Sequence, residues 1–315
     1  MTYSIRWSPR AARLRAPVLA ACFLAFAGCD ANDALEPETD LPTEATEALE
    51  AVPVDDPEFA AITRRGIPIG HFAQPMAAYG SIYNGGHGNF SPRTIVKELS
   101  AIRSRGGRVV IPFAGSPRYY REDGHFSFSK WKARVNRFRN ANISSFIRDG
   151  TVIGHYLIDE PNDPANWGGN PVPPSTLEKM ARYSKQLWPR MPTIVRVRPS
   201  YLSRNHSYLD AAWAQYLARH GSVESFIRKN VSDAKERRLG LVVGLNVLKG
   251  GIPKKTRMTA REVKSWGSTL LNSTYPCAFI SWEYNRDYLS SGGMRDAMRA
   301  LRRKAENRAT KSCRT

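Results

Sequence analysis

Two acidic side chains that follow apolar segments are the strongest candidates for catalysis. Residues 152–158 are mostly apolar, and Asp159 and Glu160 follow them directly. A second apolar run, residues 278–282, ends at Glu283. Carboxyl groups in such positions can act as general acid and base, because the carboxyl ends of parallel strands meet at one mouth of a β/α barrel. Neighbouring residues of a strand point to opposite faces, so Asp159 and Glu160 are expected to act together only where the strand ends.

The segment Asp159-Glu160-Pro161 resembles the Asn/Asp-Glu-Pro strand end of a large clan of (β/α)8-barrel glycoside hydrolases. In that clan the Glu is the general acid/base, so the resemblance implies that Glu160 donates a proton to the leaving oxygen. The reaction needs a second carboxylate, for which Glu283 is the candidate. The clan places its two acids on the fourth and seventh strands, whereas three strand-like segments separate Glu160 from Glu283. Glu283 is therefore expected on the eighth strand if Glu160 is on the fourth, and its role as nucleophile or base stays open.

Further polar and aromatic residues near strand ends are predicted to bind substrate at the same mouth. Arg196 and Arg198 share one face of their strand by the two-residue period. If that face is the barrel interior, their guanidinium groups would bind a uronate or a sulfate; the alternative is an outward pair facing helix carboxylates. The predicted substrate-binding residues are His71, Tyr119, Tyr120, Asp159, Arg196, Arg198, Gln215, Tyr216, Asn246, Trp282 and Tyr284.

The elements that must position these residues alternate between apolar, strand-like segments and amphipathic helical stretches. This pattern predicts an α/β fold, a (β/α)8 TIM-barrel-like single domain over residues 61–308. Strands are expected at residues 68–72, 108–113, 152–158, 193–197, 211–216, 239–246 and 278–283. A closed barrel needs an eighth strand, which is expected to be degenerate, and the glycine-rich stretch 79–89 is interpreted as a surface loop. A doubly wound open sheet is the alternative, although no glycine-rich phosphate turn follows the first strand.

The first 28 residues are typical of an export signal. Four arginines precede an apolar stretch, residues 16–27, that is too short to span a bilayer. The run AFAGC at residues 25–29 resembles a bacterial lipobox, which implies that Cys29 carries a lipid and that the protein is a membrane-anchored lipoprotein of the periplasm or cell surface. Ordinary cleavage before Gly28 would instead give a secreted protein. Residues 29–60 are rich in Asp, Glu, Pro, Ala and Thr and are predicted to be a disordered acidic linker.

The cysteines and histidines predict a disulfide and no metal site. Four cysteines are present, and two of them lie within the first 29 residues. Cys277 and Cys313 would be free to pair in an oxidising compartment, which would tie the C-terminal tail, residues 309–315, to a strand. The six histidines show no paired metal-ligand spacing, so neither a metal nor a cofactor is expected.

The formal net charge of +19 implies attraction to anions. Acidic polysaccharide, anionic lipid and nucleic acid all fit this charge, as does a generic basic surface. Export and the lack of a recognised nucleic-acid-binding module make nucleic acid a poor partner. The sequence therefore predicts a monomeric, metal-independent glycosidase that acts on extracellular carbohydrate. The alternative is a non-catalytic barrel that binds glycan or an anionic surface, with Glu160 serving only as a loop acid after its strand.

Overall fold

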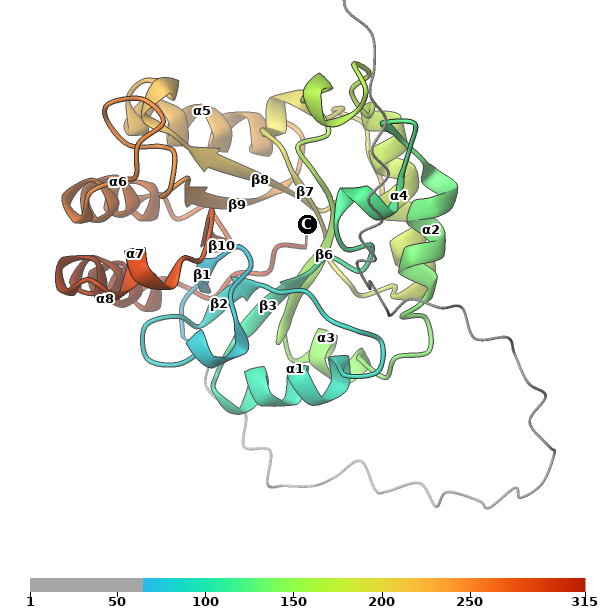
Figure 1. The fold of residues 1–315 in the computed structure, drawn as a ribbon, viewed down its shortest axis with the longest axis horizontal. Coiled ribbons are helices and arrows are strands. Elements are labelled where there is room, and N and C mark those ends of the chain that lie inside the picture. The colour runs from blue at the N-terminus through green and yellow to red at the C-terminus, as the bar shows by residue number, and fades with distance from the viewer. Residues whose placement is uncertain (1–64, 315) are drawn as a thin grey trace, which may run out of the picture. The chain divides into compact units, whose positions relative to one another are not determined.

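The computed structural model describes residues 65–314, which form a closed barrel of eight parallel strands (Figure 1). The barrel strands are β1 (Ile69–His71), β2 (Gly85–His87), β3 (Arg108–Ile111), β6 (Val152–Asp159), β7 (Thr193–Arg196), β8 (Ala211–Tyr216), β9 (Gly240–Leu245) and β10 (Ala278–Ser281). They follow one another around the barrel in chain order, and β10 closes it by pairing with β1. The predicted α/β barrel is therefore confirmed. The predicted signal peptide, the lipidation site Cys29 and the acidic linker lie outside the described residues.

The strand that sequence analysis missed is β2, which lies within the glycine-rich stretch interpreted as a loop. Gly85 pairs in parallel register with Gly70 of β1 and with Arg108 of β3. A Cβ atom at Gly85 would lie 2.6 Å from Cβ of Pro68 and 2.8 Å from the amide nitrogen of Ile69. Glycine is required here because a side chain has no room beside the neighbouring strand. A strand built from glycines lacks the β-branched residues by which strands are predicted, which explains the error.

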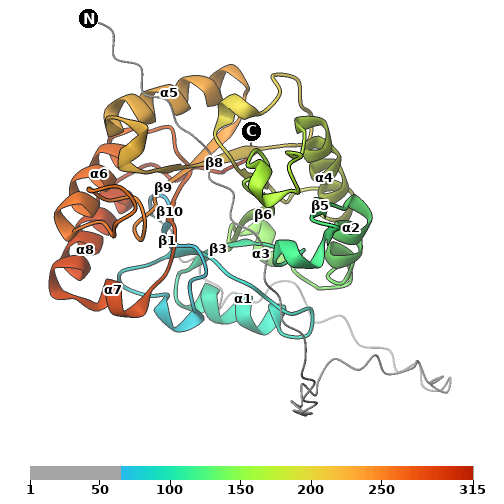
Figure 2. The ribbon, with the colours of Figure 1, turned by 45° about the horizontal axis from the view of Figure 1, so that its top comes forward.

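Helices surround the barrel (Figure 1, Figure 2). They are α1 (Ile95–Ser104), α2 (Phe128–Asn136), α3 (Ser144–Arg148), α4 (Pro174–Leu187), α5 (Val223–Glu236), α6 (Ala260–Asn272), α7 (Arg286–Ser290) and α8 (Gly292–Glu306). The long helices turn an apolar face to the strands; in α1 this face consists of Ile95, Leu99 and Ile102, all buried. A short hairpin, β4 (Arg121–Glu122) and β5 (His125–Phe126), lies between β3 and α2.

Two layers of side chains form the hydrophobic core, one inside the barrel and one between the barrel and the helices. Val110, Tyr156, Ile194, Trp213 and Ile280 come from five different strands and belong to one buried cluster, so they fill the barrel interior. The indole Nε1 of Trp213 donates a hydrogen bond to the carbonyl oxygen of Ile280, 3.1 Å away. Because side chains fill the interior, a ligand can bind only at an end of the barrel.

The C-terminal tail after α8 covers the amino ends of the strands. The predicted disulfide between Cys277 and Cys313 is present, with the two Cα atoms 5.2 Å apart. Both cysteines belong to the interior cluster, and Nζ of Lys311 donates a hydrogen bond to the carbonyl oxygen of Tyr275 at 2.8 Å. Figure 1 shows the tail running into the middle of the ring of strands. The tail therefore leaves the opposite end, the carboxyl mouth, for a binding site.

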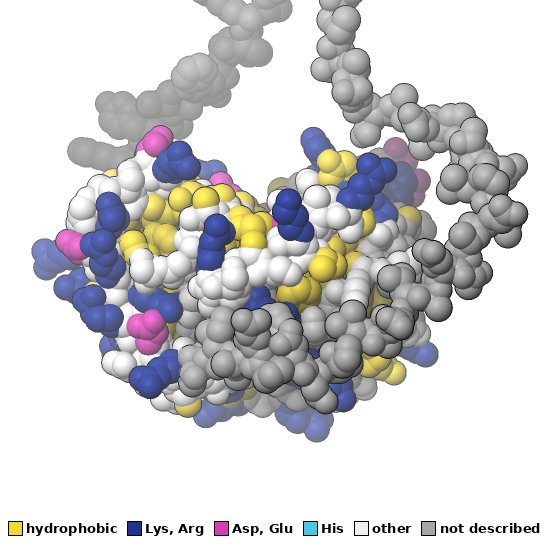
Figure 3. All heavy atoms as spheres, turned by 90° about the horizontal axis from the view of Figure 1, so that it is seen from below, with side chains coloured by type: hydrophobic (Ala, Val, Ile, Leu, Met, Phe, Trp, Pro, Cys, Tyr) yellow, Lys and Arg dark blue, Asp and Glu magenta, His cyan; other side chains and the backbone are white. Residues whose placement is uncertain are grey.

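The surface of the described residues is basic. On the face shown in Figure 3, Lys and Arg side chains are scattered, with few Asp and Glu side chains among them. This scatter is typical of a solvated surface rather than of one extended binding face. No helix among residues 65–314 is both long enough and apolar enough to cross a bilayer.

Candidate active site

The two candidate acids lie at the carboxyl mouth of the barrel. Asp159 is the last residue of β6, the fourth barrel strand, and Glu160 follows it. Glu283 comes shortly after β10, the eighth strand. All eight strands are parallel, so both acids lie at the same end. This order agrees with the expectation that Glu160 follows the fourth strand and Glu283 the eighth. The residue after the seventh strand, β9, is an amide, Asn246.

The backbone turns sharply out of the strand at Glu160. Its φ of 38° lies in the left-handed region, which is strained for a residue other than glycine. The amide of Glu160 donates a hydrogen bond to the carbonyl oxygen of Arg196 at 3.1 Å. Its carbonyl oxygen accepts hydrogen bonds from the Nε1 of Trp167 at 3.0 Å and from the amide of Asp163 at 3.1 Å. The turn ends the alternation of the strand, so the carboxyl groups of Asp159 and Glu160 reach the same partner.

That partner is Arg196, the last residue of β7, whose side chain is only 8% exposed. Its Nη1 binds the carboxylate of Asp159, and its Nη2 donates to Oε1 of Glu160 at 3.2 Å and to Oε1 of Gln215 at 3.0 Å. The guanidinium carbon also lies 4.6 Å from the centroid of the Trp282 ring. Burial alone would lower the pKa of Arg196, but the carboxylates of Asp159 and Glu160 raise it, so the group stays charged.

Glu283 lies within the electrostatic reach of the same guanidinium. Burial raises the pKa of this half-buried carboxyl, while the charges of Arg196 and Lys249 act in the opposite direction. The raised pKa favours a proton on Glu283 at a pH where ordinary glutamates are ionised. Because Trp282 precedes Glu283 and stacks on Arg196, the end of β10 and the end of β7 contribute to one site.

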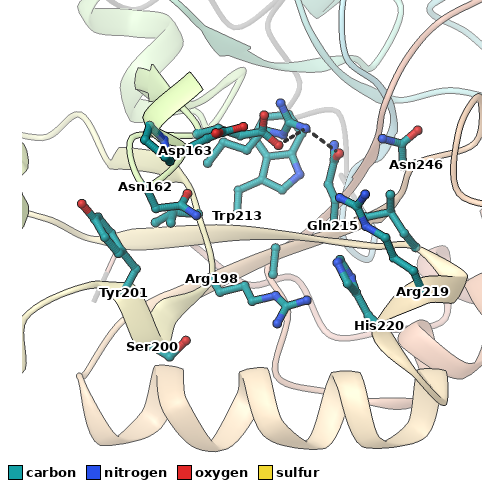
Figure 4. A pocket seen from close by; sticks show the side chains of 16 residues that line it. Asn162, Asp163, Arg198, Ser200, Tyr201, Trp213, Gln215, Arg219, His220 and Asn246 are labelled. Carbon is teal, nitrogen blue, oxygen red and sulfur yellow. Dashed lines mark hydrogen bonds and ion pairs between the residues drawn. The ribbon is translucent and has the colours of Figure 1, made fainter. Parts of the chain in front are cut away.

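Two adjoining cavities open at this mouth. The larger, of about 680 Å³, is lined by Glu160, Arg196, Gln215 and Asn246, together with the loops after β7 and β8 (Figure 4). The smaller, of about 340 Å³, is lined by the ion-paired groups of β6 and β7 and by Asn246 and Trp282. Volumes of a few hundred Å³ are typical of sites for small ligands. Since Glu160 borders both cavities, its carboxyl group lies where a ligand spanning them would pass.

Two predicted arginines contribute differently to the mouth. Arg196 is buried beneath the acids, whereas Arg198 is exposed and lines the larger cavity. Arg198 directly precedes η4 (Pro199–Tyr201), the short helix that follows β7. Neither arginine therefore belongs to an outward pair facing helix carboxylates.

Tyr216 and Tyr120 are buried in the core, and this placement gives no direct support to the prediction that they bind substrate. Tyr216 follows Gln215 on β8 and points to the opposite face of the strand. There its hydroxyl donates a hydrogen bond to the carbonyl oxygen of Gly221 at 2.8 Å. Tyr120 is buried and stacks on Trp167, with the ring centroids 6.1 Å apart. Both side chains are thus buried, and neither lines a cavity.

Three other predicted substrate-binding residues, His71, Tyr119 and Tyr284, line neither cavity, and Glu283 is likewise absent from the lining of both. His71 is fully buried on β1, where its ring meets the rings of Tyr83 and Tyr284 edge-on. Burial lowers the pKa of His71 to about 3, so the imidazole is neutral. Tyr119 is exposed, and the guanidinium carbon of Arg134 packs 4.1 Å from its ring centroid. These placements give no direct support to a substrate-binding role for the three residues.

Several residues that line the cavities come from loops that sequence analysis did not single out. No periodic pattern marks them, but each follows closely after the end of a barrel strand, which is where such barrels bind ligands. Within residues 65–314, no group of three or more His, Cys, Asp or Glu side chains is arranged to hold a metal ion. Among the missed lining residues are Asn162, Ser200, Tyr201, Arg219, His220 and Lys249.

Comparison with known proteins identifies the fold. A scan against models of protein families finds no match, and a search of curated proteins finds none. Among solved structures, a putative glycoside hydrolase from Parabacteroides distasonis matches with a TM-score of 0.50 and 13% identity, over 78% of this chain and 94% of that one. An endocellulase from Pyrococcus horikoshii, in complex with cellotetraose, matches with a TM-score of 0.49 and 13% identity, over 75% and 91%. A GH18 chitinase from Pseudoalteromonas aurantia matches with a TM-score of 0.46 and 12% identity, over 75% of this chain and 99% of that one. At these identities the likeness to the P. distasonis protein shows a shared barrel fold.

Proposed function

We propose that this protein is a glycoside hydrolase whose catalytic pair is Glu160 and Glu283. The observation that carries the proposal is that both acids lie at one mouth, within the field of the buried Arg196. Hydrolysis of a glycosidic bond needs two carboxyl groups, one to protonate the leaving oxygen and one to attack the sugar or to activate water. The likeness to a putative glycoside hydrolase agrees with this proposal, as an analogy of fold.

In the proposed mechanism Glu160 is the proton donor and Glu283 is the second carboxylate. Glu160 borders both cavities, so a glycan that spans them would bring its scissile oxygen close to this carboxyl group. Arg196 holds Glu160 in position through the hydrogen bond at 3.2 Å. The raised pKa of Glu283 points the other way, because the group that gives up a proton must first hold one; the assignment of Glu160 as donor rests on the resemblance of its strand end.

Aryl glycosides separate the two roles. A dinitrophenolate departs without protonation, so a variant that lacks the proton donor still cleaves such a substrate. We expect Glu160→Gln to lose turnover of an unactivated glycan by about 10²- to 10⁴-fold and to keep most of its kcat/KM for the dinitrophenyl glycoside, which reports only cleavage of the bond to the leaving group. Glu283→Gln should lose both activities. The opposite pattern would exchange the roles, and wild-type turnover by both variants would exclude the pair from catalysis.

A non-catalytic glycan-binding barrel is the second candidate, and Asn246 favours it. In the clan that the strand end at Glu160 resembles, the seventh strand carries the nucleophile. Here the residue after β9 is Asn246, whose Oδ1 accepts a hydrogen bond from the amide of Lys249 at 3.0 Å. A protein of this second kind would bind glycan and release no product.

We also propose that the substrate is extracellular carbohydrate and that the protein reaches it as a monomeric lipoprotein anchored through Cys29. The support is the basic, apolar and small-residue order of the first 29 residues. Mass spectrometry of the mature N-terminus should find a lipid-modified Cys29; an unmodified Cys29 or a free Gly28 would exclude the anchor. Catalysis is further proposed to need no metal, so a chelator should leave turnover unchanged.

A further inference from the structure

One wall of the larger cavity is built from basic residues that the proposed chemistry does not use. Arg198 comes from the segment after β7, while Arg219 and His220 belong to η5 (Ala218–His220), the short helix after β8. In Figure 4 these three side chains extend into the same part of the cavity. We call Arg198, Arg219 and His220 the basic wall.

No carboxylate neutralises the basic wall within residues 65–314. The two acids that line the same cavity have other partners, since Glu160 binds Arg196 and the side chain of Asp163 accepts a hydrogen bond from the amide of Ala165 at 3.0 Å. Neither Arg198 nor Arg219 forms an ion pair with any described Asp or Glu. Two guanidinium charges therefore face the cavity together.

Phe226 of α5 supports the basic wall from behind. The His220 ring stacks on it with centroids 5.8 Å apart and an interplanar angle of 7°, and the guanidinium carbon of Arg198 lies 5.7 Å from its centroid. Burial lowers the pKa of His220 to about 4, and the charges of Arg198 and Arg219 act in the same direction. The buried Nδ1 of His220 has no hydrogen-bond partner among the described atoms. The wall thus offers two cations and a neutral imidazole to an incoming group.

We propose that the basic wall is a subsite for the anionic substituent of the substrate, either a uronate carboxylate or a sulfate ester on the glycan that is cleaved at Glu160. The planar guanidinium group forms paired, charge-assisted hydrogen bonds with carboxylate and sulfate oxygens. The wall and the proposed proton donor line one cavity of about 680 Å³, so a single chain of sugars can touch both. This inference rests on the proposed function, because it names the substrate class of that site.

Matched pairs of glycans test the basic wall. The panel contains polygalacturonate, alginate and glucuronoxylan, each beside its carboxyl-reduced form, and sulfated galactans beside their desulfated forms. We expect the full-length wild-type protein to bind and cleave at least one anionic member better than its neutral counterpart. In the double variant Arg198→Gln/Arg219→Gln, binding and cleavage of that member should each fall by about tenfold or more, the effect typical of losing hydrogen bonds to a charged group. Binding and cleavage of the neutral form should fall by less than about twofold. Preference within the carboxylate or the sulfate pairs identifies the anion.

Arg228→Gln is the matched control. Arg228 is exposed on α5, where its Nη2 donates to Oγ of Ser225 at 3.2 Å, and it lines neither cavity. The control removes one positive charge close to the wall without changing it, and it should retain wild-type selectivity. The proposal would be overturned if Arg228→Gln and each single wall variant lost equal amounts of binding and cleavage on the anionic glycan. It would also be overturned if the wild type showed no preference for any anionic glycan.

The variant Glu160→Gln, with its expected low turnover, separates a failure of the wall from a failure of the proposed hydrolase. Binding of this variant to each glycan is measured by calorimetry, with no turnover required. Selective binding of an anionic glycan without cleavage by the wild type would refute the hydrolase and support the wall. Cleavage of neutral and anionic glycans at equal rates, with no effect of the wall variants, would support the hydrolase and refute the wall.

Discussion

Replacing Arg196 with Gln removes the positive charge that pairs with Asp159 and Glu160 at the mouth. The burial of these three side chains sets the expected loss in the free energy of unfolding. The Arg196 side chain is 8% exposed, while those of its partners Asp159 and Glu160 are 24% and 46% exposed. Removing one partner of a buried ion pair costs about 3 to 5 kcal/mol. Since water still reaches both carboxylates, we expect the lower end, a loss of about 3 kcal/mol in the free energy of unfolding.

A double-mutant cycle separates this charge effect from lost packing. In the background Asp159→Asn the main carboxylate is already neutral, so Arg196→Gln should cost only about 1 kcal/mol more, a coupling of about 2 kcal/mol. Urea unfolding at neutral pH measures all four proteins. Arg204→Gln is the matched control, because the Arg204–Glu236 pair is exposed and is worth about 1 kcal/mol or less. Equal losses for Arg196→Gln in both backgrounds would refute the view that Arg196 acts through its ion pair.

Three further predictions concern the frame around the site. Cys277→Ser opens a disulfide with a sequence separation of 36, so the free energy of unfolding should fall by about 4 kcal/mol. In thermal unfolding, reduction of the wild type should lower its Tm as much as the substitution does. Glu283→Gln removes a carboxyl whose pKa burial raises above its ordinary 4.5. The wild type loses stability as pH rises from that value through the raised pKa, so in urea titrations the variant should gain stability relative to the wild type as pH rises above 4.5 and show no gain below it. Gly85→Ala should destabilise the protein by about 1 to 3 kcal/mol, since its Cβ would meet Pro68 at 2.6 Å. The control Gly292→Ala, with open space around the new Cβ, should leave the stability nearly unchanged. Equal unfolding midpoints for the two variants would show that β2 tolerates a side chain.

The fold was predictable where apolar residues recur with the period of a strand or a helix. The strand before Asp159 is one such case, and the disulfide between Cys277 and Cys313 followed from their being the two cysteines outside the export segment. β2 was not predictable, because Gly85 is required by the close approach of the chain at Pro68 and Ile69, and Gly86 by the nearby side chains of Tyr79 and Gln74, which are tertiary contacts. Local sequence carries no signal of such an approach.

The site was predictable to the level of strand ends and no further. Glu160 and Glu283 were found because each ends an apolar run, and their order on the barrel agrees with that analysis. Tyr216 was assigned to the mouth although the two-residue period, applied to Gln215, puts it on the outer face. Arg219 and His220 were missed because they lie in a short helix after β8, whose backbone geometry no periodic pattern predicts.

The central claim is tested most directly by measuring release of reducing sugar from the glycan panel by the wild type and by Glu160→Gln, which removes the ionisable group while keeping the shape of the side chain. Glu122→Gln is the control, since Glu122 pairs with Lys130 at the surface and borders neither cavity. We predict product from the wild type and from Glu122→Gln, and a rate at least about 100-fold lower from Glu160→Gln. Equal rates from all three proteins would contradict the assignment of Glu160, and no product from the wild type on any glycan that it binds would contradict the assignment of a hydrolase.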